Sequence, residues 1–390
     1  MTGHPALDRV LGAVAPHGQL PSGAAAAHAP GSIELIGEPC SRTGGMLITA
    51  ALPVSAAVAL VPTKDGTLTV RSNGSVHTMD MPESVPEDLP QPVASVAAAV
   101  VALAHIIHVI PRMDAGLDIT IESDIPAQRG LGDIAAVQSA IALAANELWG
   151  DRDDVPARAR LASALQEAQA AHVGEHVPLY PYTAALRAKA GHVLLCNHAD
   201  GAVTQLPLPD QVALTALCSA DLTGGSAPAN RHGFFADACR TFGVPTLAAL
   251  PDADTRVVEW IRARHEVDAN SEAPTEGRAA RWLEETAGSS DRARALSGHI
   301  RHGDVSACLA TIRVDTRTRD KSIDPDNPLG RLITAANNAG AACRCVSAPG
   351  AAAVAWGPAE LAEDIRGAIH GAGGWELPLT GAAAGLIWKA

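Results

Sequence analysis

The sequence predicts an α+β protein built from two domains. Its 390 residues are enough to bury more than one hydrophobic core. Apolar runs of strand length alternate along the chain with stretches of helical periodicity, and no repeat period relates one part of the chain to another. A loop at 198–210 divides the chain into comparable halves, so we expect a lead at 1–28 and domains at 29–200 and 201–390.

The elements follow from the local patterns of apolar residues and from the turn residues between them. The predicted strands are 32–38, 46–61 (interrupted near Pro53), 67–72, 117–123, 192–197, 212–219, 343–347 and 351–356. The predicted helices are a short one in the lead, one that begins at Val93, and those at 134–148, 156–172, 183–189, 231–242, 254–266, 277–300 and 326–339.

One apolar stretch is long enough to be considered as a membrane span. Val93 to Ile110 contains eighteen residues without Asp, Glu, Lys or Arg. It also carries His105 and His108 and is rich in alanine, and its valines recur on one helical face. We therefore expect a buried core helix and no membrane partner.

Composition narrows the class of partner and the compartment. The net charge of −13 disfavours nucleic acid or an anionic membrane as the main partner, although a nucleotide can still be held in a local pocket. Seven scattered cysteines indicate reduced thiols. The N-terminus lacks the basic and apolar regions of a secretory signal, so we predict a cytoplasmic protein.

Four windows of the sequence resemble motifs of one kinase family. They are APGSIELIGEPCSRTGG (29–45), SDIPAQRGLGDIAAVQSAI (123–141), VGEHVPLYPYTAALRAKAGHVLL (173–195) and AGAACRCVSAPGAAAVAWGP (339–358). In this order they resemble the galactokinase motifs A-P-G-R-x-N-L-I-G-E-H-x-D-Y-x-G-G and G-L-S-S-S-A, the segment that carries the catalytic aspartate, and G-A-R-M-T-G-x-G-F-G-G. The stretch RARHEVDAN (262–270) also resembles the family's R-A-R-H-x-x-x-E-N helix. The chain is identified as a galactokinase-like member of the GHMP kinase superfamily with degenerate motifs.

This resemblance implies the two-domain GHMP kinase fold, with a nucleotide cleft between an N-terminal kinase domain at 29–200 and a C-terminal one at 201–390. It also implies ATP-dependent phosphorylation of galactose at the anomeric hydroxyl, with ATP and magnesium as cofactors and a small sugar as substrate. Such an enzyme must hold polyphosphate and Mg²⁺, orient the acceptor hydroxyl and stabilise the transferring group.

The phosphate-loop window keeps only part of its motif. Gly130 and Leu131 match the family, but the three serine positions are Gly132, Asp133 and Ile134. The resemblance implies that Gly130, Leu131, Gly132 and Asp133 form the nucleotide-binding loop. Asp133 stands where a helix N-cap is expected, where a carboxylate satisfies the N–H groups that a phosphate would otherwise bind. An alternative role for Asp133 is a magnesium ligand.

The catalytic aspartate of the family aligns with Pro181, which has no side-chain proton acceptor. If the alignment shifts by one residue, Tyr180 or Tyr182 takes this position, and a phenol is a poor base near neutral pH. Glu175 and His176 are possible substitutes only if the loop has rearranged. We therefore assign no catalytic residue.

The sugar-binding window has also changed. Glu38 is kept, but the family's following His and Asp are Pro39 and Ser41, and its early Arg is Ser32. One serine cannot replace the acceptor pair of a carboxylate, and the loss of the Arg removes a cation near the transferring group. Glu38 either binds sugar or makes a structural hydrogen bond. By resemblance, the substrate-binding residues are Glu38, Ser41, Gly44 and Gly45.

A competing motif overlaps the third window. His172, Glu175 and His176 match the zinc-peptidase pattern H-x-x-E-H, in which two histidines one helical turn apart bind zinc. Gly174 lies inside the motif and Pro178 follows it closely, whereas this chemistry needs a continuous helix. A zinc hydrolase is therefore a minor alternative.

The changes in the motifs predict a galactokinase-like protein that is impaired or inactive as a kinase. It would act as a sensor of sugar or nucleotide, or as a partner of another protein. The alternatives are an active kinase for a different sugar or small alcohol, with Asp133 on the metal, and an interaction protein that binds neither ligand.

Overall fold

The computed structural model describes most of the chain. The described residues are 3–15, 19–110, 116–150, 152–173, 177–219, 229–268, 272–319, 327–346 and 352–388. They form two compact units, each discontinuous in sequence. The first contains Met1–Ile33, Ala50–Gly191 and Leu379–Ala390, and the second contains Glu34–Thr49 and His192–Pro378. The assignment of family domains to 29–200 and 201–390 stays a prediction.

The first unit is built on one sheet. Its strands are β1 (Ala25–Gly37), β2 (Met46–Thr63), β3 (Thr67–Ser72), β4 (Ser75–Asp80), β5 (Gly116–Ser123) and β12 (Leu386–Trp388), in the order β12-β1-β2-β5-β3-β4. β3 and β5 run parallel, whereas β1 and β12, β2 and β5, and β3 and β4 run antiparallel. β1 is buried along its whole length, and both β1 and β2 continue into the second unit.

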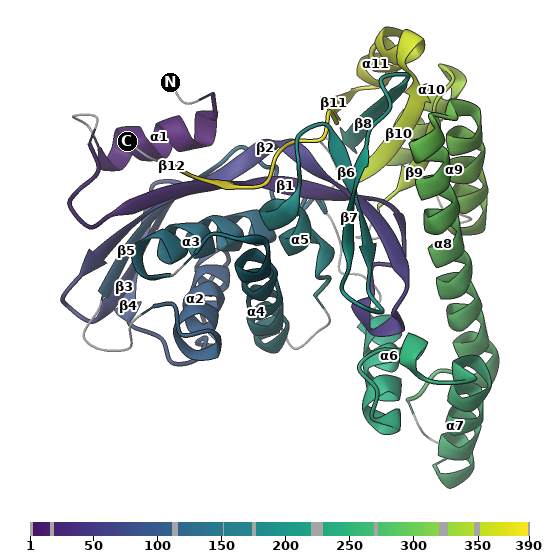
Figure 1. Ribbon diagram of the computed structural model, residues 1–390, viewed down its shortest axis with the longest axis horizontal. Coiled ribbons are helices and arrows are strands. Elements are labelled where there is room, and N and C mark those ends of the chain that lie inside the picture. Colours follow the sequence, from purple (N-terminus) through teal and green to yellow (C-terminus); the bar gives the residue numbers. More distant parts are fainter. Residues whose placement is uncertain are drawn as a thin grey trace. The chain divides into compact units, whose positions relative to one another are not determined.

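Helices cover both faces of this sheet. They are α1 (Pro5–Val14), α2 (Val93–Val101), α3 (Asp133–Trp149), α4 (Val155–Val173) and α5 (Tyr180–Arg187). Figure 1 shows α2 to α5 on one face and α1 on the other. α1 buries Leu7 and Val10, three residues apart on one helical face, against small alanines of β1 and β2.

The predicted helix from Val93 is confirmed as a core helix. Every residue from Val93 to Val100 is buried. The regular helix is shorter than the apolar run, because a π-helical turn, η2 (Ala102–Ile106), follows α2. Within the described ranges, no helix combines the length and the hydropathy needed to cross a bilayer.

The second unit contains a hairpin, a four-stranded sheet and a layer of helices. The hairpin strands are β6 (His192–Asn197) and β7 (Val203–Pro207), and β6 pairs with the first residues of β2. The sheet has the order β11-β8-β10-β9, from β8 (Val212–Ser219), β9 (Ala342–Cys345), β10 (Ala352–Pro358) and β11 (Gly374–Pro378). The helices are α6 (Ala229–Phe242), α7 (Ala253–Val267), α8 (Glu276–His302), α9 (Val305–Arg319), α10 (Pro328–Asn338) and α11 (Ala362–Gly371).

A buried group of charges lies inside the second unit. The Arg344 side chain is 1% exposed, and its guanidinium donates to Asp315 at 2.6 Å and also to Glu34. Arg292 donates to the other oxygen of Asp315 at 2.6 Å. Two carboxylates and two guanidiniums therefore neutralise one another inside this unit, where an isolated charge would be strongly destabilising.

Candidate functional site

The turn before α3 packs closely against β1. Gly130 and Gly132 have φ angles of 72° and 70°, a conformation that favours glycine. A Cβ atom on Gly132 would lie 2.4 Å from Ser32 Oγ, and the Ser32 N–H donates to Leu131 O at 2.9 Å. These contacts give the two glycines of the predicted phosphate loop a structural role.

Asp133 is the first residue of α3 rather than its N-cap. The N-cap is Gly132, in a left-handed conformation that the turn requires. The Asp133 carboxylate nevertheless bonds to the loop, because it accepts a hydrogen bond from the Gln128 N–H at 3.2 Å. Backbone hydrogen bonds from Asp133 and Ile134 also stabilise its charged form, but burial outweighs them and raises the pKa of the carboxyl. The chain's own carboxylate thus occupies backbone N–H groups at the start of α3 and just before the predicted phosphate loop.

Pro181, the position of the family's aspartate, lies in the first turn of α5. Proline is well suited to this position because the first N–H groups of a helix have no intrahelical partner. Of the proposed substitutes, Glu175 and His176 lie outside the described residues. His172 lies in the last turn of α4. The structure therefore supplies no side-chain base at the aligned position.

The neighbouring phenol of Tyr182 is committed to a buried hydrogen-bond network. Its hydroxyl donates to Gln138 Oε1 at 2.7 Å, and Gln138 Nε2 donates to Gln169 Oε1 and to Ser95 O at 2.8 and 2.7 Å. Burial raises the pKa of Tyr182 well above that of a free phenol. Tyr182 is therefore a poor proton acceptor for a substrate.

Glu38, in the second unit, is fully buried and surrounded by protein donors. Its Oε2 accepts from Arg231 Nη2 at 2.8 Å and from Thr286 Oγ1 at 3.2 Å. Its Oε1 accepts from the Cys40 N–H at 3.0 Å. Both oxygens thus have partners within the chain, which matches the structural role that the sequence left open for Glu38. The spacing along the chain gave no signal for Arg231 or Thr286.

The other predicted sugar residues surround a small hollow in the same unit. Gly44 and Gly45 line a cavity of about 260 Å³ together with Thr286 and Ser290, and Ser41 is not part of its wall. Gly44 has a φ of 75°, and a Cβ there would lie 2.4 Å from Ala248 Cβ. The structure therefore brings Gly44 and Gly45 together next to Glu38, but the Glu38 carboxylate is not on the wall of the cavity.

His198 is a buried imidazole that interacts electrostatically with Glu38. Burial lowers its pKa, although the Glu38 carboxylate opposes this shift. His198 is therefore neutral near pH 7 and adds no positive charge to the region. Arg231 is the cation that compensates Glu38.

Among the residues that the structure describes, no three His, Cys, Asp or Glu side chains gather in a way that could hold a metal ion. Two of the three residues of the H-x-x-E-H motif lie outside this part of the chain, so the zinc interpretation stays a prediction.

The sequence and the fold both match kinases of one superfamily. The family model "GHMP kinases N terminal domain" matches residues 94–178. A galactokinase of Mycobacterium tuberculosis is 29% identical over 255 residues, which cover 62% of this chain and 68% of the relative. A galactokinase of Streptomyces coelicolor is 28% identical over 183 residues, 46% of this chain and 45% of the relative.

Solved structures extend the similarity of fold to nearly the whole chain. The galactokinase of Lactococcus lactis, solved in complex with galactose, has a TM-score of 0.75 at 15% identity and covers 98% of this chain and 99% of its own. A mevalonate kinase has a TM-score of 0.60 at 11% identity, with 94% and 99% covered. The chain therefore has the α+β GHMP kinase fold, and in sequence it resembles the galactokinases of the GHMP kinase superfamily.

Proposed function

We propose that this protein has lost most or all of the ability to phosphorylate galactose at its anomeric hydroxyl, and that it acts as a sensor of a sugar or nucleotide, or as a partner of another protein. The observation that carries the proposal is the position of the Asp133 carboxylate, which accepts hydrogen bonds from backbone N–H groups on both sides of the predicted phosphate loop, those of Gln128, Asp133 and Ile134. A phosphate group would need these same donors.

Charge repulsion adds to this competition for donors. Two unit negative charges about 4 Å apart repel by about 4 kcal/mol at an effective dielectric constant near 20. A nucleoside triphosphate at this loop would meet Asp133 as an anion, with no side-chain hydroxyl at the former serine positions. The residues present do not fit ATP with magnesium as the family motif does, and we derive no phosphoryl-transfer step for them.

The acceptor side of the reaction supports the same proposal. Pro181 offers no proton acceptor, and Tyr182 is buried with its hydroxyl bonded to Gln138. Glu38 is fully buried and already bonded to Arg231, Thr286 and Cys40, so a sugar hydroxyl could reach it only if the surrounding side chains moved. All seven cysteines are free thiols, which agrees with our proposal of a cytoplasmic protein.

An assay of product formation together with a binding measurement tests the proposal. In a coupled ADP-release assay with galactose and ATP–Mg²⁺, we expect turnover far below the ordinary kinase range of about 1–100 s⁻¹. A sensor should still show a rise in melting temperature with its ligand, because a ligand that binds only the folded state stabilises it. Turnover in the ordinary range would contradict the loss of activity. If no sugar or nucleotide raises the melting temperature, the sensor role is refuted and only the role as a partner of another protein remains.

A further inference from the structure

A second cavity lies in the first unit, at the end of α3 opposite to the phosphate loop. Its volume is about 610 Å³, and its wall comes from three segments: the residues after η2, the end of α3 and the start of α4. Asp133 and Trp149 are the two ends of α3, which at about 1.5 Å per residue lie roughly 24 Å apart. The cavity is therefore separate from the loop that Asp133 fills.

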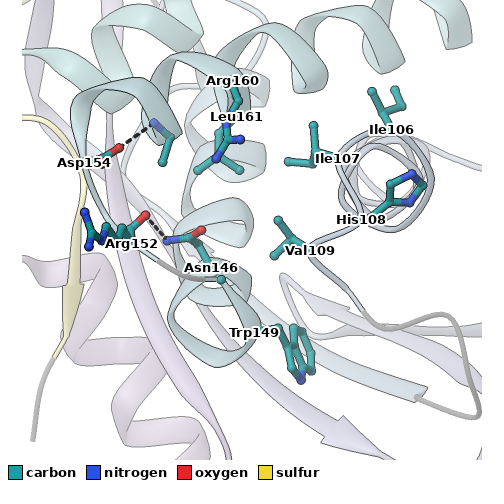
Figure 2. Close-up of a pocket in the computed structure, with 12 residues that line it drawn as sticks. Ile106, Ile107, His108, Val109, Asn146, Trp149, Arg152, Asp154, Arg160 and Leu161 are labelled. Carbon is teal, nitrogen blue, oxygen red and sulfur yellow. Dashed lines mark hydrogen bonds between the residues drawn. The ribbon is translucent and has the colours of Figure 1, made fainter.

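Asn146 contributes a buried acceptor to this cavity. The residue is 8% exposed, and its Nδ2 donates to Arg152 O at 3.3 Å. Figure 2 shows the amide oxygen on the side away from that bond, toward Val109. No hydrogen bond to this oxygen is formed by the described residues. Gly150 makes room for it, because a Cβ there would lie 2.1 Å from Asn146 Oδ1.

Two arginines on the wall have no carboxylate partner among the residues that the structure places. Arg152 and Arg160 both line the cavity and are exposed. Asp153 pairs with Arg158 at 2.6 Å. Asp154 also lines the cavity, and its Oδ1 caps α4 through the Ala157 N–H at 2.9 Å. Asp151, next to Arg152, lies outside the described residues. The described part of the wall thus carries two guanidiniums and one carboxylate, and this local positive charge, in a protein with a net charge of −13, favours an anionic partner.

Apolar side chains of Ile107, Val109, Leu161 and Trp149 also line the cavity, beside the polar His108 and Asp154. Figure 2 shows Ile107 and Val109 extending from the coil after η2 toward the side of the cavity formed by α3 and α4. Ile106, on the same wall, is 42% exposed, which leaves apolar surface in contact with water. A carbon skeleton bound here would remove that apolar surface from water, which favours binding.

We propose that this cavity binds a small organic anion, a phosphate ester or a carboxylate that also carries hydroxyl groups. The guanidiniums of Arg152 and Arg160 bind the anionic group, and Asn146 Oδ1 accepts a hydrogen bond from a hydroxyl. The apolar side chains of the wall cover part of the carbon skeleton, and the volume is in the range of small-molecule sites. This goes beyond the proposed function, because it places a ligand of the sensor at a site distinct from the degenerate kinase motifs.

Titration calorimetry with three probes of similar size tests the proposal. Glucose 6-phosphate supplies a phosphate ester, gluconate a carboxylate, and glucose neither. We expect saturable binding of at least one anion, with a Kd near or below about 1 mM, and at least tenfold weaker binding of glucose. Equal affinity for glucose, or no saturable binding of either anion, would overturn the proposal.

Variants then locate the bound anion. Arg160→Ala should weaken binding about tenfold or more, and Asn146→Leu should reduce the preference for hydroxylated over simple anions such as inorganic phosphate. Arg281→Ala is the matched control, since Arg281 is an exposed helical arginine in the second unit and forms no ion pair with any residue that the structure describes. Because Arg160 is exposed, its replacement should not unfold the protein, and unchanged affinity in Arg160→Ala would refute the site.

The phosphate loop provides the second control. Asp133→Ser should leave anion binding at the cavity unchanged, because the two ends of α3 are far apart. If Asp133→Ser changes the affinity and Arg160→Ala does not, the anion binds at the loop and the cavity proposal fails, independently of whether the protein phosphorylates galactose.

Discussion

Replacing Asp133 by asparagine removes one negative charge from the phosphate loop and changes little else. The two side chains have nearly the same shape, and an amide oxygen can still accept the Gln128 N–H, which Asp133 now accepts at 3.2 Å. The variant should therefore fold as the wild type does. Asp133→Ala would remove the acceptor as well, so it separates the effect of charge from that of the hydrogen bonds.

The expected gain in nucleotide affinity follows from Coulomb's law. The full repulsion of about 4 kcal/mol applies to two charges about 4 Å apart at an effective dielectric constant near 20. Asp133 is only half-buried and solvent screens part of this repulsion, so we expect about 1.4–2.8 kcal/mol, a 10- to 100-fold tighter Kd for ADP–Mg²⁺. Titration calorimetry measures this directly, with Asp80→Asn as a control for net charge at an exposed strand end.

The same carboxyl predicts a pH dependence. Burial raises the pKa of Asp133 in the folded protein, so the folded state binds this proton more tightly than the unfolded state. The contribution of Asp133 to stability therefore falls as pH rises from the unfolded pKa through the folded one. Asp133→Asn should lose this part of the pH dependence, and the wild type should bind nucleotide more tightly as pH falls toward the pKa. If Asp133→Asn instead weakens nucleotide binding, the carboxylate is a metal ligand and our reasoning fails.

Three further substitutions probe the buried polar groups, each measured by urea unfolding followed by circular dichroism. Arg344→Met should destabilise the protein by about 3–5 kcal/mol, because it leaves Glu34 and Asp315 buried without their shared cation; a loss no larger than that of the exposed control Arg281→Met would refute this. Glu38→Ala should also lower stability, by about 3–5 kcal/mol, since Arg231 loses its carboxylate, and an unchanged midpoint would show that the ion pair is unimportant. Tyr182→Phe should lower stability by about 1–3 kcal/mol because Gln138 Oε1 loses its donor. We expect any kinase turnover to be unaffected. A large fall in turnover at unchanged stability would make Tyr182 part of a catalytic site.

The fold class and most of the central elements could be predicted from periodicity and from motif order. Strands with regular apolar patterns, such as β5, lie where the sequence placed them. The start of β1 could not be predicted, because Ala25 to Pro30 has a composition that is poor for strands. Pairing of Ala26, Ala27 and His28 with β12 determines its conformation, and the partner residues lie more than 350 positions away in sequence.

For the candidate site, the sequence identified the changed residues but not their partners. Asp133 was recognised as an anion that competes with phosphate, yet its exact place in the helix depended on the left-handed conformation of Gly132. The bonds from Arg231 and Thr286 to Glu38 join residues 193 and 248 positions apart. No local pattern can indicate such contacts, because they depend on how α6 and α8 pack in the folded unit.

The charged side chains in the altered motif windows have hydrogen-bond or ion-pair partners within the chain, and this is relevant to the function that we propose. The Asp133 carboxylate has backbone donors within its own unit, and Glu38 has its cation and hydroxyl within the other. Glu34, which stands where the family motif has asparagine, is neutralised by Arg344. Charges introduced at random into buried positions would leave unpaired groups and destabilise the fold by several kcal/mol each. The carboxylates of Asp133 and Glu34, which replace residues of the family motif, instead have donors within the chain, so these replacements are compatible with the fold. This supports our proposal of a role that requires a stable fold, such as binding a ligand or a partner.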